Sequence, residues 1–564
     1  MARIIFGICF VLSLSLAFGQ KGTWQAAVFS NGSPKEQGHL LNGQKVGYWR
    51  AFFANGALQS EGHFKDGKRH QFWRNYHSNG QLSGEGNFQS GSLTGHWATY
   101  DQNGRILSEG TYAEGQKEGY WKQYFNGQLR SEGHYNEGQP AGYWHYYDHQ
   151  GQRYLEGNYN TMGQRTGHWR KFLTGNLEAE GIYQKGYRTG AWVEYDQLGN
   201  ITGKGNYNKS LKEGEWQEFE NNHLIAEGEY QKGARSGYWR FVDAAGNTTL
   251  ECIYKQGKRT GPCRLYEGGA VVAEGAYQGG QRSGYWRFFD RKGREIRKGH
   301  FKDDAQSGFW EIFNADGKLW HQGKFKQGKK QGLWQSFHPN GQLKRQGHYQ
   351  AGKKQGYWDY FTEQGQLKDT GNYQKGKKNG WWKSFEADGQ LNLVGRLTND
   401  QRHGVWKWLY NDGTVRKIGS YDNGSRKGFW HTYFPNGQLH LTGAYEDDRR
   451  NDWWSEFYEN GQQYSLGQYR QDVKTGFWQY FHINGQIRKI GEYLDGEPYD
   501  WWLLFECNGD LVFVGYFITN VKDGHFRYYR FGRLFSEGSY ESDTRVGAWK
   551  FYDAAGELEN IIEY

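Results

Sequence analysis

Residues 49–73 read WRAFFANGALQSEGHFKDGKRHQFW, and this stretch decides the fold because the rest of the chain repeats its pattern. It holds short aromatic runs that are separated by the dipeptide Asn55-Gly56 and by the turn that starts at Lys65. Aromatic runs bounded by such turn residues are typical of β-strands joined as hairpins. Each repeat therefore predicts two strands.

A tryptophan returns about every 24 residues, at 23 positions from Trp24 to Trp549. Only Cys263 and Phe526 interrupt the series, so 21 of the 26 tryptophans lie on it. A period of this length indicates a repeat architecture in which each unit packs on its neighbours. Hydrophobic residues make up only 36% of the chain, but aromatic residues reach 18%, so rings must do the packing. We predict an all-β fold, an elongated and twisted single-layer antiparallel ribbon of tandem hairpins.

The turns predict the register between strands. If Asn55-Gly56 is a two-residue loop, Trp49 lies opposite Gly62. Across the following turn, the same reasoning places Phe64 opposite Gln71, where most repeats have glycine. We expect each indole to lie over the bare backbone of a neighbouring glycine, which makes a second layer unnecessary. Differences in repeat length fall between the strands, as expected if turns absorb them.

Two cysteines test this register. Cys252 stands at a glycine position and Cys263 at a tryptophan position, and the predicted register places them directly opposite. Paired positions bring Cα atoms within disulfide reach, so we predict a bridge, formed in an oxidising compartment. The alternative is two buried free thiols. Cys507 has no evident partner.

The repeat motif resembles the bacterial variant of the MORN repeat. The resemblance is carried by residues such as Glu132-Gly133, Tyr135 and Gly142-Tyr-Trp144, and again by Gly356-Tyr-Trp358 and Asn436-Gly437-Gln-Leu439. It covers essentially the whole chain after the first residues, in about 23 tandem copies. It implies a long ribbon of hairpins that serves as a scaffold or as a protein-binding or lipid-binding segment. Some relatives carry an antitoxin label.

The amino terminus differs from the repeats. An apolar run from Ile4 to Phe18 follows Arg3 and ends in small residues, which predicts a cleavable signal peptide over residues 1–19. A retained membrane anchor is the alternative, although the run is shorter than a bilayer requires. We therefore expect an exported protein that is periplasmic, associated with the cell surface or secreted, with no transmembrane segment after signal removal.

One continuous array is expected over residues 20–564. Its second face, opposite the tryptophans, is expected to be polar over 20–379, to carry an apolar stripe over 380–517, and to end in terminal repeats over 518–564. The stripe combines the residue before each tryptophan with the residue twelve positions before it. Its members are Trp381, Val394, Val405, Ile418, Phe429, Trp453, Leu466, Phe477, Ile490, Trp501 and Val514. Either a partner, a second copy or a lipid covers this stripe, or tighter coiling buries it within the chain.

One turn edge of the ribbon is basic. A ladder of cations there would suit an anionic glycan or lipid surface, whereas the alternative is that exposed lysines only keep the turns soluble. The candidate polyanion edge comprises Lys329, Lys330, Lys353, Lys354, Lys377, Lys378, Arg426, Lys427, Arg449 and Arg450.

Catalysis has little support in the sequence. Histidines are scattered, and no spacing of His, Cys or acidic residues predicts a metal site, a cofactor site or catalytic residues. We therefore expect a non-enzymatic scaffold whose partner is another protein or itself, with no specific recognition of nucleic acid. The chief alternative is a module that binds anionic glycans or lipids through the basic edge and the aromatic residues. A toxin-neutralising protein is a lesser alternative.

Overall fold

The computed structural model describes residues 22–564, so the predicted signal peptide at 1–19 lies outside the described residues. Between residues 22 and 564 the chain forms 46 β-strands and no helix. Accordingly, this part of the chain has no helix long and apolar enough to cross a membrane. The prediction of an all-β chain of hairpins is confirmed.

The chain divides into two compact units, one ending at Ala270 and the other covering Val271–Tyr564. The strands of unit 1 are β1 (Thr23–Val28), β2 (Pro34–Leu41), β3 (Gln44–Phe52), β4 (Leu58–Lys65), β5 (Lys68–Tyr76), β6 (Leu82–Gln89), β7 (Ser92–Tyr100), β8 (Ile106–Ala113), β9 (Gln116–Phe125), β10 (Gln128–Asn136), β11 (Gln139–Tyr147), β12 (Arg153–Tyr159), β13 (Arg165–Leu173), β14 (Asn176–Gln184), β15 (Tyr187–Tyr195), β16 (Ile201–Asn208), β17 (Leu211–Glu220), β18 (His223–Gln231), β19 (Ala234–Val242), β20 (Thr248–Lys255) and β21 (Lys258–Glu267).

The strands of unit 2 are β22 (Ala270–Gln278), β23 (Gln281–Phe289), β24 (Glu295–Lys302), β25 (Ala305–Phe313), β26 (Leu319–Lys326), β27 (Lys329–Phe337), β28 (Leu343–Gln350), β29 (Lys353–Phe361), β30 (Leu367–Gln374), β31 (Lys377–Phe385), β32 (Leu391–Thr398), β33 (Gln401–Leu409), β34 (Val415–Asp422), β35 (Ser425–Tyr433), β36 (Leu439–Glu446), β37 (Arg449–Phe457), β38 (Gln463–Arg470), β39 (Val473–Phe481), β40 (Ile487–Leu494), β41 (Glu497–Phe505), β42 (Leu511–Ile518), β43 (Val521–Arg530), β44 (Arg533–Glu541), β45 (Thr544–Tyr552) and β46 (Leu558–Glu563).

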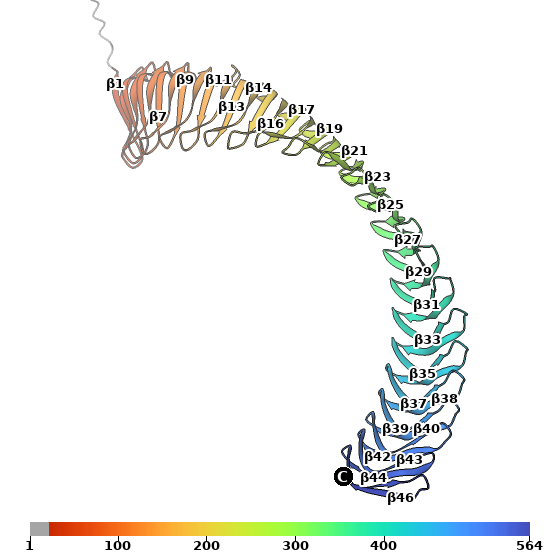
Figure 1. Cartoon of the computed structure of the whole chain (residues 1–564). Helices are drawn as coiled ribbons and strands as arrows, with labels where there is room; N and C mark the ends of the chain where they lie inside the picture. Colours follow the sequence, from red (N-terminus) through yellow and green to blue (C-terminus); the bar gives the residue numbers. More distant parts are fainter. Residues whose placement is uncertain (1–21) are drawn as a thin grey trace, which may run out of the picture. The chain divides into compact units, whose positions relative to one another are not determined.

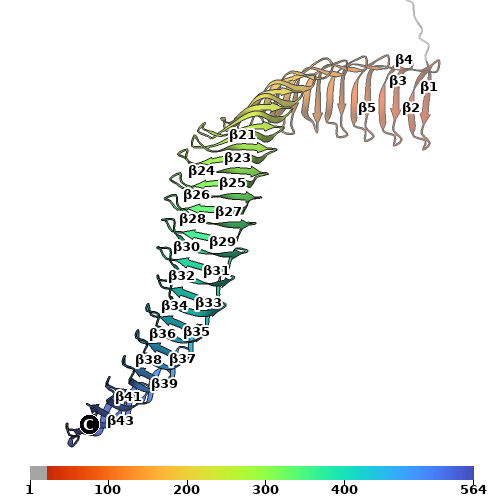
Figure 2. The same cartoon turned by 90° about the vertical axis from the view of Figure 1, so that its right-hand side faces the viewer.

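Within each unit the strands form an open antiparallel sheet in which each strand pairs with the next one along the chain (Figures 1 and 2). In β3 and β4, Trp49 lies opposite Gly62, as the sequence predicts. Gly62 in turn lies opposite Trp73 of β5. Tryptophan and glycine thus alternate across the strands on one side of the sheet, here called the first face. The opposite side is the second face.

The two turns of each repeat differ in length from what the sequence suggested: the turn at Asn55-Gly56 is the longer one, and the other is the two-residue turn. Asn55-Gly56 is not a two-residue loop, because the Phe53 amide donates to the Ala57 carbonyl and closes a longer loop. The two-residue turn is instead Asp66 and Gly67, whose φ angles of 48° and 74° are those of a type I′ turn. The predicted pairing at Trp49 survives because register shifts in the strands compensate for the changed loop.

The predicted pairing of Phe64 with Gln71 is wrong because β5 contains a β-bulge. Gly62 lies opposite Trp73, but Phe64 lies opposite Arg69 and not Gln71, because two extra residues of β5 sit in the bulge. Gln71 has a φ of 61°, a left-handed conformation that glycine adopts without strain. This explains why most repeats have glycine two residues before the tryptophan.

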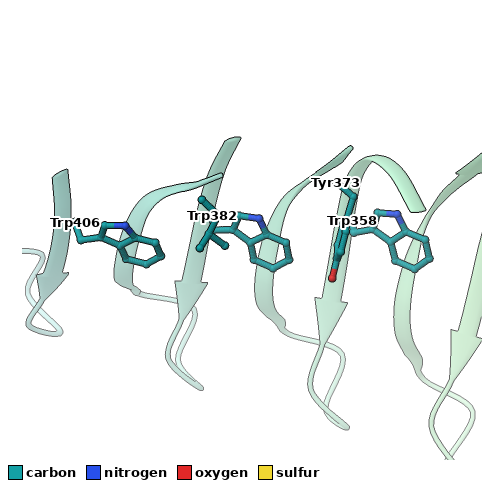
Figure 3. Packing of buried hydrophobic residues seen from close by; sticks show 5 residues of the cluster. Trp358, Tyr373, Trp382 and Trp406 are labelled. Atoms are coloured by element: carbon teal, nitrogen blue, oxygen red, sulfur yellow. The ribbon is translucent and has the colours of Figure 1, made fainter. Parts of the chain in front are cut away.

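The core consists of indole rings lying on glycines, as predicted. A Cβ built on Gly62 would lie 2.4 Å from Cδ2 of Trp73, so only glycine leaves room for the ring. Trp73 is 2% exposed, donates from Nε1 to the His63 carbonyl at 3.0 Å, and meets Phe64 edge-on at 5.0 Å between ring centroids. Figure 3 shows the same arrangement in unit 2, where indoles from alternate strands point the same way. The rings in this view are Trp358, Tyr373, Trp382 and Trp406.

Trp24 does not belong to this core series. It lies opposite His39, and Gln25 takes the position opposite Gly38 where later repeats have tryptophan. Trp24 is therefore on the second face, where it is 59% exposed and meets His39 edge-on at 5.2 Å. The spacing of 25 residues to Trp49 reflects this shift of one position and not an insertion in a turn.

Differences in repeat length do fall in turns. After Trp121 one residue is missing, and Asn126 and Gly127 form a two-residue turn that pairs Phe125 with Gln128. Turns absorb such changes because a lost residue within a strand would reverse the facing of every later side chain.

Cys252 of β20 and Cys263 of β21 are directly paired, with Cα atoms 4.2 Å apart, and they are joined by a disulfide. The bridge takes the place of an indole on a glycine. Cys507 is a free, exposed thiol.

Candidate binding surfaces

The second face of unit 2 carries a row of exposed apolar side chains. Each occupies the position before a core tryptophan, in every odd-numbered strand from β23 to β41, and each is between 44% and 69% exposed. We call this set the exposed apolar row. Its members are Tyr285, Phe309, Leu333, Tyr357, Trp381, Val405, Phe429, Trp453, Phe477 and Trp501.

The other half of the predicted stripe lies on the same face but is less exposed. Val394 is half-buried between two cross-strand neighbours, Lys383 and Lys407. Ile418 lies between Lys407 and His431 in the same way. The structure therefore places the predicted residues on one face, but lysine stems and other polar side chains separate them into short apolar segments.

The exposed rings also occur before residue 380. The same repeat position holds rings that are 41% to 50% exposed in unit 1, namely Tyr48, Phe72, Tyr120, Tyr143 and Tyr238. The second face over 20–379 is therefore not simply polar. What differs between the early and late repeats is the neighbouring position, twelve residues before the core tryptophan.

In most repeats of unit 1 that neighbouring position holds a glutamate, and in several of them a tyrosine hydroxyl donates to it. The hydroxyl of Tyr76 donates to Glu61 at 2.8 Å, and Arg50 approaches the same carboxylate at 3.3 Å. Burial alone would raise the pKa of Glu61, but hydrogen bonds from Tyr48 and Tyr76 hold that pKa below its ordinary value. The same contact joins Tyr124 to Glu109, Tyr147 to Glu132, Tyr195 to Glu180 and Tyr266 to Glu251.

In several late repeats an apolar residue replaces the glutamate, and the tyrosine hydroxyl is lost as well. Three residues after the core ring, most late repeats have a side chain without a hydroxyl, with Tyr433 and Tyr529 as the exceptions. The residues without a hydroxyl at this position are Phe385, Leu409, Phe457, Phe481 and Phe505. A carboxylate without its donors would be costly to bury, and both groups are lost together where Val394 occurs with Leu409 and Ile490 with Phe505. The exchange is incomplete, because Ile418 still occurs with Tyr433 and Val514 with Tyr529.

The structure separates the predicted polyanion edge into two sets. Lys329, Lys353, Lys377, Lys427 and Arg449 are exposed at the turns. The other five, Lys330, Lys354, Lys378, Arg426 and Arg450, are half-buried and lie over aromatic rings of the first face.

The half-buried cations make close contacts with the core. Nζ of Lys354 lies 4.4 Å from the centroid of the Trp358 ring and donates to the Tyr360 hydroxyl at 2.7 Å. Arg426 lies 3.9 Å from the Tyr445 ring and forms an ion pair with Asp448 at 3.0 Å. Such contacts stabilise the sheet by cation–π attraction and by covering the rings with aliphatic stems.

That these cations cover aromatic rings was not predicted from the sequence, although their position in the repeat is regular. A lysine or arginine stands four residues before the core tryptophan in most repeats. In unit 1 the members that contact the tryptophan ring are Lys45, Arg69, Lys117, Arg165, Arg188, Lys212 and Arg235.

A shallow depression of about 970 Å³ opens on unit 1. It forms where Ala191 and Glu215 replace the exposed rings, and Lys204, Glu227 and Tyr238 also line it. Within residues 22–564, no group of three or more His, Cys, Asp or Glu side chains is placed to hold a metal ion.

Comparison with known proteins identifies the repeat. The model of the MORN repeat variant family matches residues 45–66, 73–90 and 93–114 of unit 1 and residues 330–351 and 402–423 of unit 2. A comparison with curated proteins found no match.

Solved structures give only a distant likeness. A crystal structure of TcdB2-TccC3 is 11% identical with a TM-score of 0.13, and the match covers 96% of this chain and 31% of that one. A Photorhabdus luminescens Tc holotoxin pore is 10% identical with a TM-score of 0.12, covering 96% and 35%. The chain thus spans about a third of the length of the chains it matches. From the five matched segments and the hairpins that contain them, the chain carries MORN repeats of the variant type in both units.

Proposed function

We propose that the chain is an exported, non-enzymatic scaffold that binds another protein, or a second copy of itself, through the exposed apolar row of unit 2. The observation that carries this proposal is the exposure of large side chains in one hairpin after another, with Trp381 at 53% and Phe429 at 65%. Isolated exposed apolar residues are ordinary, but a repeated series on one face is typical of an interaction site.

Spacing supports the same interpretation. The row has one member per hairpin, so its members recur at about 10 Å, twice the spacing of neighbouring strands. A regular series of anchors on a sheet suits a partner that lies along it. Tryptophan and phenylalanine at such positions supply large contact areas at low cost in side-chain entropy.

Export is the part of the proposal that rests on sequence alone. The arginine, the apolar run and the small residues of the first 19 positions support a cleavable signal. Cell fractionation with detection of the mature amino terminus tests it, and finding the protein uncleaved in the cytoplasm would contradict it.

The binding proposal is tested by replacing Trp453 and Trp501 together with serine. We expect the variant to fold, because both side chains are about half exposed, and to lose oligomeric mass or envelope retention. Light scattering after size exclusion measures the mass, and fractionation measures the retention. The matched control replaces Phe72 and Tyr120, which occupy the same position in unit 1, with serine. If neither property changes in the Trp453→Ser/Trp501→Ser variant, or if the control shows the same loss, the proposed site is wrong.

A further inference from the structure

Four cations gather on the first face of unit 2, over strands β27, β28, β29 and β31. Lys330 lies 4.2 Å from the Trp334 ring and Lys378 lies 4.1 Å from the Trp382 ring. Lys354 lies over Trp358, and Arg345 donates from Nε to the Ser336 hydroxyl at 3.3 Å. Lys330, Arg345, Lys354 and Lys378 are called the cation cluster below.

The side chains of the cation cluster have no direct ionic partner among residues 22–564. None of its members forms an ion pair within 4 Å in residues 22–564. Two carboxylates lie near the cluster: Asp400 accepts a hydrogen bond from the Lys378 backbone amide at 2.7 Å, and Asp369 accepts one from Ser384. Elsewhere, some ring-covering cations of both units are paired, as Lys212 with Glu194 at 3.0 Å in unit 1 and Arg426 with Asp448 at 3.0 Å in unit 2 show. Ring-covering cations thus occur with and without ion pairs, and the cation cluster brings together cations whose side chains form none among residues 22–564.

The cations of the cluster also repel one another. Burial, and then the charges of Arg345, Lys378 and Lys330, lower the pKa of Lys354 from its ordinary 10.5 to about 8. Burial and the charges of Lys330 and Arg345 likewise lower the pKa of His321 to about 4. An array of like charges that the fold holds together without direct ion pairs is a surface complementary to an anion.

We propose that the cation cluster binds an acidic polysaccharide that lies across strands β27 to β31. Four strand spacings of about 4.8 Å give a track of about 19 Å, with one ring-covering lysine per hairpin, which fits an extended chain with repeated negative charges. The proposal concerns the first face and is independent of the exposed apolar row.

The buried rings favour a polysaccharide over single-stranded nucleic acid. Proteins that bind single strands combine cations with exposed aromatic platforms on which bases stack. Here the rings beneath the cations are buried, since Trp334 and Trp358 are 3% and 1% exposed. Recognition on this face therefore proceeds through charge-assisted hydrogen bonds from lysine and arginine and not through stacking.

The test uses the full chain with heparin as the acidic polysaccharide, dextran as a neutral one and single-stranded DNA as the competing polyanion. We expect heparin to bind with an affinity that falls steeply with added salt, and dextran not to bind. Arg345→Gln combined with Lys354→Gln should weaken heparin binding by about tenfold or more, since each lost contact to a charged group is worth about 1.4 kcal/mol or more. Titration calorimetry at several salt concentrations measures both effects.

Two matched variants distinguish the cation cluster from the exposed turn edge and from the ring-covering cations of unit 1. Lys329→Gln with Lys353→Gln removes the same number of charges from the exposed turn edge, and Lys117→Gln removes a ring-covering lysine from unit 1. Both should bind heparin within about twofold of the unaltered chain, far below the tenfold effect of 1.4 kcal/mol. Arg345→Gln alone, which leaves every ring covered, keeps the test valid if the double variant is unstable. The proposal is overturned if heparin does not bind, if a control weakens binding as much, or if DNA binds as tightly and depends on the same residues.

Discussion

At the scale of the residue, the absence of a side chain at glycine allows the core of this protein to pack. Each core indole lies where the Cβ of an opposing residue would be, so glycine is required on one strand because tryptophan stands on the next. The indole also donates to a backbone carbonyl, as Trp73 does to His63, which satisfies its only polar group. The pair therefore combines burial, close packing and a hydrogen bond in one sheet layer.

Gly205 and Gly203 of β16 provide a direct test of this pairing. A Cβ on Gly205 would lie 2.5 Å from Cδ2 of Trp216, whereas on Gly203 its nearest contact would be 3.3 Å away, with a glutamate side chain. Gly205→Ala should lower the free energy of unfolding by about 1–3 kcal/mol through overpacking. Gly203→Ala should be nearly neutral, because Ala179 and Ala226 fill this position in neighbouring repeats. Urea unfolding measures both, and equal losses would contradict the steric argument.

The lowered pKa of Lys354 predicts how the stability of the protein depends on pH. Its pKa is about 8 in the folded state, where burial and neighbouring cations lower it, against an ordinary value of 10.5. Between these two values the unfolded chain binds more protons than the folded chain, so stability rises with pH there. The folded protein should therefore gain stability relative to a Lys354→Met variant from pH 8 to 10, and show no relative change below pH 7. Urea unfolding of both proteins across this range measures the difference, and a relative loss would show the sign to be wrong.

At the scale of the hairpin, the bulge and the two turns set what each strand presents. The type I′ turn at Asp66 and Gly67 makes a tight connection on one edge, and the longer loop after Phe53 lies on the other. The bulge at Gln71 restores the alignment of tryptophan with glycine. A repeat therefore tolerates a changed loop as long as the bulge and strand pairing keep the indole over its glycine.

The disulfide between Cys252 and Cys263 leads to a prediction about the stability of its hairpin. It replaces one indole on glycine, so Cys252→Gly with Cys263→Trp should restore the packing of the other repeats. Reduction of the native protein should lower the stability of the β20 and β21 hairpin by about 2–4 kcal/mol, as expected for a short closed loop. The double variant should be insensitive to reductant. Hydrogen exchange of this hairpin with and without dithiothreitol measures the effect, and an unchanged native protein would contradict it.

At the scale of the whole molecule, stability is a sum of contacts between successive strands. Each indole contacts its own strand and the strands beside it, and the hydrophobic clusters are correspondingly local. Repeat arrays of this kind respond to damage in the affected repeat and its neighbours.

The substitution Trp310→Ala tests whether damage stays local to one repeat and its neighbours. Trp310 of β25 is fully buried between Phe301 and Phe325, so its loss should cost about 3–5 kcal/mol. Hydrogen exchange should accelerate in β24 to β26 and remain unchanged in β43 to β45 of the same unit. Uniform acceleration throughout unit 2 would instead indicate a single cooperative fold. An exposed replacement, Phe309→Ala in the same strand, serves as the control.

The sequence predicted the strands, the antiparallel hairpins and the positions of the core rings from Trp49 onward, because a strict repeat shows the same packing rule many times. It also predicted that Cys252 lies opposite Cys263. It failed at Trp24, because a shift of one residue moves a side chain to the other face without altering the apparent period. It also misplaced half of the basic edge, because neighbouring lysines look alike in sequence.

The sequence by itself determined which residues form strands and which rings form the core, since these follow from spacing and from the absence of a side chain at glycine. Only the tertiary structure decided which cations are exposed. Lys353 lies at the turn and Lys354 covers an indole, although the two are adjacent and identical. The physical reason is that side chains alternate between faces, while turn type and bulges, which depend on backbone angles, fix which face each residue takes.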